Sequence, residues 1–387
     1  MNFYERALAL QSETVAHRRF LHKHAEVGLS MPVAVKYVTE QLRAIGLEPQ
    51  TCGHGVVATI GSGNSCILLR ADMDALPMKE ESGESFACSE NAAHTCGHDF
   101  HAAMLLTAAK LLQEQRSALK GTVKLMFQPG EEILQGAADM IHHGVLENPT
   151  VDVAMGLHVA AGKLPIGLYM YNENGPMMNS ADNFSLTFQG RGGHAAYPKN
   201  TVNPIPIAAQ FCLAAISHVE ETSKSAFVSF GQIHSGTAVN IIPNSATIEG
   251  TLRTADPICR RKLLEELAQI ATQTAQAHGG GSCFTRLSGT PPLICNTELT
   301  KEMADCIRQL AIPNIQPHSG ITATASEDFA EVAQAVPSTF FYLSAGFMDD
   351  RGQFPAHHPK VRFNEDVLPI GAACYAHCAT TWLQNHA

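Results

Sequence analysis

The sequence predicts an α/β protein whose mostly parallel-sheet domain is interrupted by a ferredoxin-like βαββαβ domain. Short apolar runs alternate with helical segments up to about residue 180, which is typical of a parallel sheet covered by helices. The order then changes to βαββαβ, and the first pattern resumes after Pro291-Pro292. We therefore expect one domain at 1–180 plus 290–387 and an inserted domain at 181–289, a division that suits a chain of 387 residues.

The first domain begins with apolar residues at helical spacing, which predict helices near 3–24 and 31–46. Gly46 is a stop signal for the second of them. The elements expected next are strands at 56–60 and 66–69, a helix at 102–112, a strand at 122–127, a helix at 137–143 and a strand at 151–157.

In the inserted domain Phe184, Leu186 and Phe188 alternate with polar residues, which predicts a half-buried strand at 183–189. The remaining elements of this domain are expected as a helix at 202–220, strands at 226–233 and 245–253, a helix at 257–278 and a strand at 282–288. For the last part of the chain we expect helices near 297–310, 327–335 and 366–384 and a strand at 339–344.

Composition excludes several classes of partner. The formal net charge is −10 and there is no Lys/Arg-rich run, which argues against nucleic acid and anionic membrane. Residues 1–6 lack the pattern of a signal peptide, and no apolar run approaches the roughly 20 residues that span a bilayer. The 11 cysteines include no C-x-x-C pair, so we expect reduced thiols in a cytoplasmic protein.

Two carboxylates follow the strand expected at 66–69. Asp72 and Asp74 stand two residues apart in the segment 70–77, directly after Arg70. Alone, this pattern is more typical of solvated charges where a strand ends. It is also typical of carboxylates that hold metal ligands in place without binding the metal themselves.

Residues 94–101 (HTCGHDFH) carry the strongest signal in the chain. Cys96 and His98 can both face one metal ion, because Gly97 lets the loop turn between them. Asp99 follows directly and, like Asp72 and Asp74, is expected to hold the ligands in place without binding the metal itself. The dipole of the next helix is expected to lower the pKa of the Cys96 thiol. A structural histidine cluster is one alternative. A cysteine nucleophile with His98 as its base is another, but spacing of two residues suits that chemistry poorly.

Three further motifs are weak when taken singly. Glu131 and Glu132 (in QPGEE, 128–132) are adjacent carboxylates, which repel unless a cation lies near them, although Glu-Glu is also common on surfaces. His158 ends the strand expected at 151–157, where a buried structural histidine is the more frequent reading. His357 lies in an Ala-His-His-Pro segment that could be surface.

Taken together, these motifs supply a complete set of metal donors. Cys96, His98, Glu132, His158 and His357 offer nitrogen, oxygen and sulfur atoms for two divalent ions, with the metal left undecided. The inserted domain adds candidates of its own, which are His194 in a Gly-rich turn, Asn240 among apolar residues, and Arg253 near a strand's end, where its guanidinium could bind a carboxylate.

These blocks, in this order, resemble the amidohydrolase family that includes hippurate hydrolase, bacterial N-acyl-amino-acid amidohydrolases and the plant auxin-conjugate (IAA-amino acid) hydrolases. The resemblance runs from RRFLH at 18–22 to His357, and its best matches are 94–101 and 128–132. Cys96, in place of a bridging Asp, points to the hippurate and auxin-conjugate branch. Departures are Ala25 and Ala356, where members usually have Pro and Leu; they affect only local loop shape.

The resemblance implies a dinuclear metal centre, with manganese expected first and zinc, cobalt or nickel open. It implies Cys96, His98, Glu132, His158 and His357 as ligands and Glu131 as general base and acid. It further implies that the inserted domain acts as a lid and dimerises, and that His194, Asn240 and Arg253 handle an N-acyl amino acid. Alternatives are a dipeptidase or an N-carbamoyl-amino-acid hydrolase of the same fold, and a metal-binding protein without activity. The presence of Glu131 argues against the last of these, because a protein that has lost activity tends to lose its catalytic base.

Overall fold

The computed structural model describes residues 1–387 except 311 and 314, and it divides into two compact units. The first unit comprises Met1–Met177, Ile294–Thr322 and Asp328–Ala387. The second comprises Met178–Leu293 and Ala323–Glu327. These bounds lie within a few residues of the expected ones. The difference is the short segment Ala323–Glu327, which belongs to the second unit although the sequence pattern assigned it to the first.

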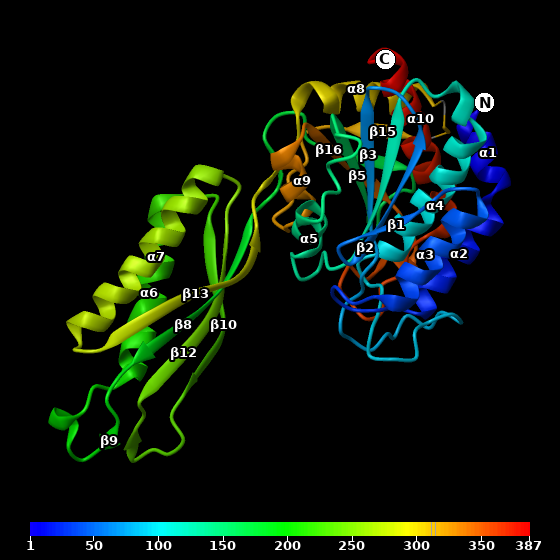
Figure 1. Cartoon of the computed structure of the whole chain (residues 1–387). Helices are drawn as coiled ribbons and strands as arrows, with labels where there is room; N and C mark the ends of the chain where they lie inside the picture. Colours follow the sequence, from blue (N-terminus) through cyan, green and yellow to red (C-terminus); the bar gives the residue numbers. More distant parts are fainter. Residues whose placement is uncertain (311, 314) are drawn as a thin grey trace. The chain divides into compact units, whose positions relative to one another are not determined.

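A mixed sheet of eight strands, in the order β1-β2-β4-β3-β5-β16-β6-β15, forms the centre of the first unit (Figure 1). β3, β4, β5 and β16 run parallel to their neighbours in this group, whereas β1 and β2 are antiparallel additions at one edge. The strand bounds are β1 Gln50–Cys52, β2 Gly55–Gly61, β3 Cys66–Asp72, β4 Thr122–Gln128, β5 Val153–Ala160, β6 Leu168–Met170, β15 Gln316–His318 and β16 Ser338–Ser344.

Helices cover both faces of this sheet, which is why its central strands are buried throughout. Leu69 and Ala71 of β3 join a core with helices α4 and α10, whereas the intervening Arg70 contacts Asp328 at the start of α9 on the other face. The helix bounds are α1 Phe3–Ala9, α2 Gln11–Lys23, α3 Pro32–Ala44, α4 His98–Glu114, α5 Gly136–His142, α8 Thr297–Gln309, α9 Phe329–Ala335 and α10 Leu368–Asn385.

The second unit is a four-stranded antiparallel sheet in the order β10-β12-β8-β13, with α6 and α7 side by side on one face (Figure 1). Its elements follow as β8 Ala181–Gln189, α6 Pro204–Thr222, β10 Phe227–Ser235, β12 Ser245–Arg253, α7 Pro257–Ala277 and β13 Gly281–Thr290. A small ladder pairs β9 Gly193–His194 with β11 Ile241–Ile242. The predicted fold class, a mostly parallel sheet with a βαββαβ insertion, is confirmed.

The helix expected at 3–24 is wrong as one element. It is broken at Leu10, whose backbone leaves the helical conformation and separates α1 from α2. The helix expected at 102–112 starts earlier, at His98, because Gly97 in a left-handed conformation ends the preceding loop. The short strands β1, β6 and β15 carry too little periodicity to be predicted. Among the described residues, none of the helices combines the length and apolar character needed to cross a bilayer.

Candidate metal centre

The structure brings the five predicted donors together in the first unit. Cys96 and His98 lie where α4 begins, Glu132 follows β4, His158 lies within β5, and His357 lies between β16 and α10. The Cys96 Sγ is 3.3 Å from the His357 Nε2 and 3.4 Å from the His158 Nε2. The His357 Nε2 is 3.5 Å from the Glu132 Oε1. The sequence pattern placed His158 directly after a strand at 151–157, whereas in the structure His158 lies inside β5.

These donors form groups that share members, as two neighbouring cations would require. Within each group the ligand atoms lie within 4.8 Å of one another. Cys96 belongs to two groups and Glu132 to two. The groups are Cys96, His98 and His158; Cys96, Glu132 and His357; and His98, Glu131 and Glu132.

Gly97 is the residue that allows this approach. Its φ is +93°, a left-handed conformation that a side chain disfavours. A β-carbon at this position would also stand 2.4 Å from the Val159 Cγ2. The turn between Cys96 and His98 therefore requires glycine, in agreement with the sequence argument.

Hydrogen bonds fix the tautomers of the histidines. The His158 Nδ1 donates to the Val159 carbonyl at 2.7 Å, which leaves the Nε2 lone pair on the side of Cys96. Burial lowers the pKa of His158 well below its usual range, so the ring is neutral. The His98 Nδ1 lies 3.3 Å from the Asp74 Oδ1, which leaves the His98 Nε2 available. His158 thus presents the neutral form that binds metal ions. Burial opposes a charge on His98, but Asp72 and Asp74 outweigh it and raise the pKa of His98 well above its usual range, so this ring would release a proton when a cation binds.

Asp74 contacts three residues of the candidate metal centre. Its two carboxylate oxygens accept the backbone N–H groups of Glu131 and Glu132, each at 3.1 Å, in addition to its contact with His98. One buried carboxylate thereby sets the positions of the predicted base, of one oxygen ligand and of one nitrogen ligand. This arrangement suits the supporting role predicted for Asp74.

Asp72, the other predicted supporting carboxylate of this strand, lies in a buried network that the sequence did not reveal. It accepts from Arg70 at 2.8 Å and from the His101 Nδ1, whose Nε2 in turn accepts the Val159 N–H at 2.8 Å. Arg70 also donates to Gln128 at 2.9 Å. The network links β3, α4, β4 and β5. The signal for His101 was present, since it follows His98 by three residues on one helix.

Asp99 faces a second buried network, on the side of α2. Its Oδ2 accepts from the Arg18 Nε at 2.7 Å and from the His22 Nδ1 at 2.8 Å, and the His22 Nε2 lies 3.0 Å from Glu80. Burial opposes a charge on His22, but Asp99 and Glu80 outweigh it and the pKa of His22 is raised. The imidazolium thus bridges two carboxylates and joins α2 to the start of α4.

Two of the donor residues have a buried polar atom that forms no hydrogen bond within the described part of the chain. The His98 Nε2 and the Glu132 Oε1 are buried and have no hydrogen-bond partner among the described residues. Loss of water around the sulfur raises the pKa of the Cys96 thiol well above its usual range. The expectation that the helix dipole lowers this pKa is therefore wrong for the protein without a cation, because burial outweighs the dipole. Orphaned nitrogen and oxygen atoms beside a thiol fit divalent cations, which would supply the missing positive charge.

His357 has an unusual backbone conformation. Its φ is +65°, although only glycine adopts this region without cost, and its N–H donates to the Thr95 carbonyl at 2.9 Å. The bond ties His357 to the loop that carries Cys96, more than 250 residues away in the chain. Strain of this kind persists where the surroundings enforce it, which is common at functional sites.

The candidates of the second unit lie in a different environment. His194 is exposed and its Nδ1 accepts the Ala196 N–H at 3.1 Å, so its Nε2 carries the proton. The Asn240 carbonyl accepts the Ala195 N–H at 3.1 Å, which brings Asn240 and His194 together. Arg253, the last residue of β12, donates to the Ser326 hydroxyl at 3.1 Å and forms no ion pair with any carboxylate among the described residues. Burial lowers the pKa of its guanidinium.

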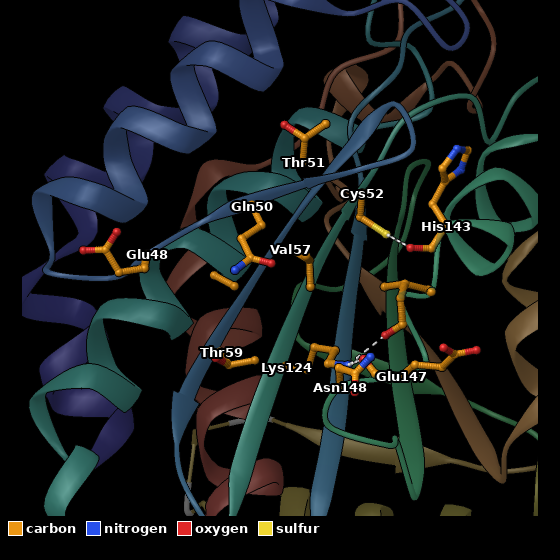
Figure 2. Close-up of a pocket in the computed structure, with 13 residues that line it drawn as sticks. Glu48, Gln50, Thr51, Cys52, Val57, Thr59, Lys124, His143, Glu147 and Asn148 are labelled. Carbon is orange, nitrogen blue, oxygen red and sulfur yellow. Dashed lines mark hydrogen bonds between the residues drawn. The ribbon is translucent and has the colours of Figure 1, made fainter.

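A cavity of about 300 Å³ lies elsewhere in the first unit, over β1, β2 and β4, and shares no lining residue with the donors (Figure 2). Its buried Lys124 donates to the carbonyls of Val145, Glu147 and Pro149 at 2.6–3.0 Å. The Cys52 thiol donates to backbone oxygen as well. These contacts join β4 to the loop after α5 and leave the ammonium no capacity for a ligand.

Comparisons with known proteins identify the family of the chain. A family model described as Peptidase family M20/M25/M40 matches residues 68–381. The chain is 35% identical to IAA-amino acid hydrolase ILR1-like 2 of Arabidopsis thaliana, over 96% of this chain and 85% of that protein. It is 32% identical to hippurate hydrolase of Campylobacter jejuni, over 99% of this chain and 100% of that protein.

Among solved structures, a dinuclear metal binding peptidase of the M20 family from Bacillus subtilis aligns with a TM-score of 0.82 and 28% identity, over 97% of this chain and 99% of that chain. The resemblance inferred from the motifs is thereby confirmed. The chain belongs to peptidase family M20/M25/M40 and is a hydrolase of that family.

Proposed function

We propose that this hydrolase cleaves the amide bond of N-acyl amino acids, releasing a carboxylic acid and an amino acid. The observation that carries the proposal is the position of Glu131, a buried carboxylate whose Oε2 lies 3.9 Å from the His98 Nε2 and which shares a group of ligand atoms within 4.8 Å of one another with His98 and Glu132. Relatives named for IAA-amino acid and hippurate hydrolysis support the substrate class, because both names describe N-acylated amino acids.

In this proposal Cys96, His98, Glu132, His158 and His357 would hold two divalent cations, with manganese the first candidate and zinc, cobalt or nickel the others. Such ions supply Lewis acid chemistry and lower the pKa of water. Glu131 takes the proton from the attacking water and later gives it to the leaving nitrogen. The protonated Nε2 of His194 donates to the oxyanion. Arg253, which has no acidic partner among the described residues, binds the substrate carboxylate, and Asn240 contributes to substrate binding.

A substrate panel tests the proposal. Purified protein would be assayed with N-benzoyl, N-acetyl and indole-acetyl amino acids, with dipeptides and with N-carbamoyl amino acids, each in the presence of Mn²⁺, Zn²⁺, Co²⁺ or Ni²⁺. We expect turnover of N-acyl amino acids with at least one metal. Turnover of dipeptides or N-carbamoyl compounds alone would replace this proposal by one of the two alternative hydrolases.

We further propose a homodimer in which His194 acts in the active site of the partner subunit. β10 is an edge strand of its sheet, and exposed edges can pair with a second copy. Mixing Glu131→Gln with His194→Ala under conditions that exchange subunits would leave each heterodimer one doubly damaged and one intact site. Activity should return to at most about half per heterodimer on this count of sites. No recovery despite proven exchange would contradict the arrangement.

A further inference from the structure

His101 is a fully buried histidine of α4 that follows His98 by one helical turn and is not one of the five donors. Its Nδ1 donates to the Asp72 carboxylate, and its Nε2 accepts the Val159 N–H at 2.8 Å. The ring satisfies both partners only as the neutral tautomer that carries its proton on Nδ1. Hydrogen bonds to two different strands, β3 and β5, therefore fix the position and the tautomer of this ring.

Val159 connects His101 to the predicted ligand His158. The N–H that His101 binds belongs to the peptide group between His158 and Val159, so the bond fixes the backbone of His158 itself. The Val159 carbonyl accepts the His158 Nδ1 at 2.7 Å, which orients the His158 ring. The two rings also meet directly, since their centroids lie 4.5 Å apart in an edge-on contact. One residue thus transmits the position of His101 to both the backbone and the side chain of His158.

The surroundings of Val159 leave its N–H no substitute for His101. Val159 is 1% exposed, so water cannot take the place of the imidazole nitrogen. Its Cγ2 stands 2.4 Å from the position that a β-carbon on Gly97 would occupy, so its side chain packs against that turn. Without the acceptor, the N–H would stay unsatisfied or the peptide group would have to turn, and a buried unsatisfied donor is costly. Either outcome disturbs the strand at His158.

Both nitrogens of His101 are in use, which separates its role from that of a metal ligand. Asp72, His98 and His101 have ligand atoms within 4.8 Å of one another, as the members of the donor groups do. Binding a cation through His101 would, however, break its bond to Asp72 or its bond to Val159. The ring therefore supports a ligand and is not itself a ligand.

We propose that His101 is a positioning residue that holds His158 in place for one of the two cations, an inference that rests on the proposed metal centre. His158 belongs to a single donor group of that centre, together with Cys96 and His98. The other group that contains Cys96 is completed by Glu132 and His357, which follow β4 and β16. Loss of the His101 acceptor should therefore weaken one cation more than the other.

Two substitutions at position 101 separate its two hydrogen bonds. The side-chain amide of asparagine can take the place of the imidazole Nδ1, and that of glutamine the place of Nε2. His101→Asn thus keeps a donor for Asp72 and removes the acceptor for Val159, whereas His101→Gln keeps that acceptor. In calorimetric titrations of metal-free protein with Mn²⁺ and with Zn²⁺, we expect His101→Asn to weaken one of two ions by about 10–100-fold, the range for residues that orient ligands. The other ion should change little, and His101→Gln should restore most of the loss.

His17→Asn is the matched control, because His17 is a buried histidine of α2 whose partner is the Tyr37 hydroxyl, at 2.8 Å. It should lower the thermal midpoint and leave both affinities unchanged. Equal weakening of both ions in His101→Asn would overturn the selective role of His101. A larger loss in His101→Gln than in His101→Asn would assign the effect to the bond with Asp72 and overturn it as well. If the unmodified protein binds neither Mn²⁺ nor Zn²⁺, it is the metal centre of the proposed function that fails.

The unmodified protein provides a second test, which decides the matter if the variants do not fold. In NMR spectra of ¹⁵N-labelled protein, the His101 Nε2 should give the signal of an unprotonated ring nitrogen. It should also show a scalar coupling, across the hydrogen bond, to the amide nitrogen of Val159. A protonated Nε2 on His101, or a Val159 amide coupled to another acceptor, would overturn the proposal.

Discussion

The two units hold their candidate residues in opposite ways. In the first unit, the predicted ligands and Glu131 are supported by buried carboxylates and guanidinium groups, so Asp74, Asp72 and Asp99 each have several partners. In the second unit, His194 is exposed, and Arg253 donates to the Ser326 hydroxyl with no carboxylate partner in the described part of the chain. Residues that take part in breaking the amide bond are held in fixed positions by the protein before the substrate binds. Residues that bind the substrate, in contrast, keep N–H groups that no acceptor among the described residues occupies.

This contrast distinguishes residues that take part in the chemical step from residues that recognise the substrate. A cation centre built from five donors needs orientation that only a packed interior provides, and the tautomers of His98 and His158 are set in this way. A guanidinium that binds a carboxylate gains most if no protein carboxylate competes for it. We therefore expect substitutions in the first unit, and substitution of His194, to reduce the rate for all substrates, whereas the effect of substituting Arg253 should depend on the substrate.

Glu131→Gln should have the largest effect. It keeps the shape of the side chain and removes the proton acceptor, so kcat should fall by roughly 10²–10⁴-fold, the range for general acid–base groups. Steady-state kinetics would measure the loss for several N-acyl amino acids, and elemental analysis should find the metal content unchanged. A near-normal kcat would mean that another group takes the proton.

Asp74→Asn should come next. Because the Asp74 carboxylate contacts His98 and accepts the N–H groups of Glu131 and Glu132, its loss should weaken metal affinity or activity by about 10–100-fold, as for other residues that orient ligands. A metal titration would report the change. Asp256→Asn is the control, since Asp256 caps α7 in the second unit and Asn also caps helices. Equal metal affinity in both variants would argue against the supporting role.

Arg253→Ala should distinguish substrates. Losing hydrogen bonds to a charged group costs about 1.5–3 kcal/mol, so kcat/KM for carboxylate-bearing substrates should fall by about 10–100-fold, with amidated analogues affected much less. Arg261→Ala, which removes an exposed arginine of α7, should leave both kinds of substrate unaffected. If both kinds of substrate lost the same factor in Arg253→Ala, the residue would be structural.

The smallest effect is expected from His22→Gln, and it concerns stability against pH. The folded protein raises the pKa of His22, through Asp99 and Glu80 acting against burial, above the value of about 6.5 expected in the unfolded chain. The stabilisation is therefore complete below about pH 6.5 and is lost as pH rises through the folded pKa. Urea unfolding at several pH values should show the largest difference between wild type and variant at the acidic end.

The donors could be predicted from the sequence because metal-binding chemistry depends on residue type and because parallel strands end at one edge of a sheet. It predicted Asp74 and Asp99 as supports but not their partners, since Arg18 and His22 come from a helix far away in the chain and nothing in their spacing points to Asp99. The break at Leu10 and the left-handed conformation of His357 were also invisible, because no residue type there signals them. Such features follow from tertiary packing.

Metal content measured together with activity tests the central claim most directly. The protein would be purified, analysed for bound metals, treated with a chelator, dialysed and assayed before and after adding Mn²⁺. We expect about two divalent ions per chain, loss of amide hydrolysis after chelation and its return with added metal. Full activity in a preparation shown to contain no metal would contradict the account.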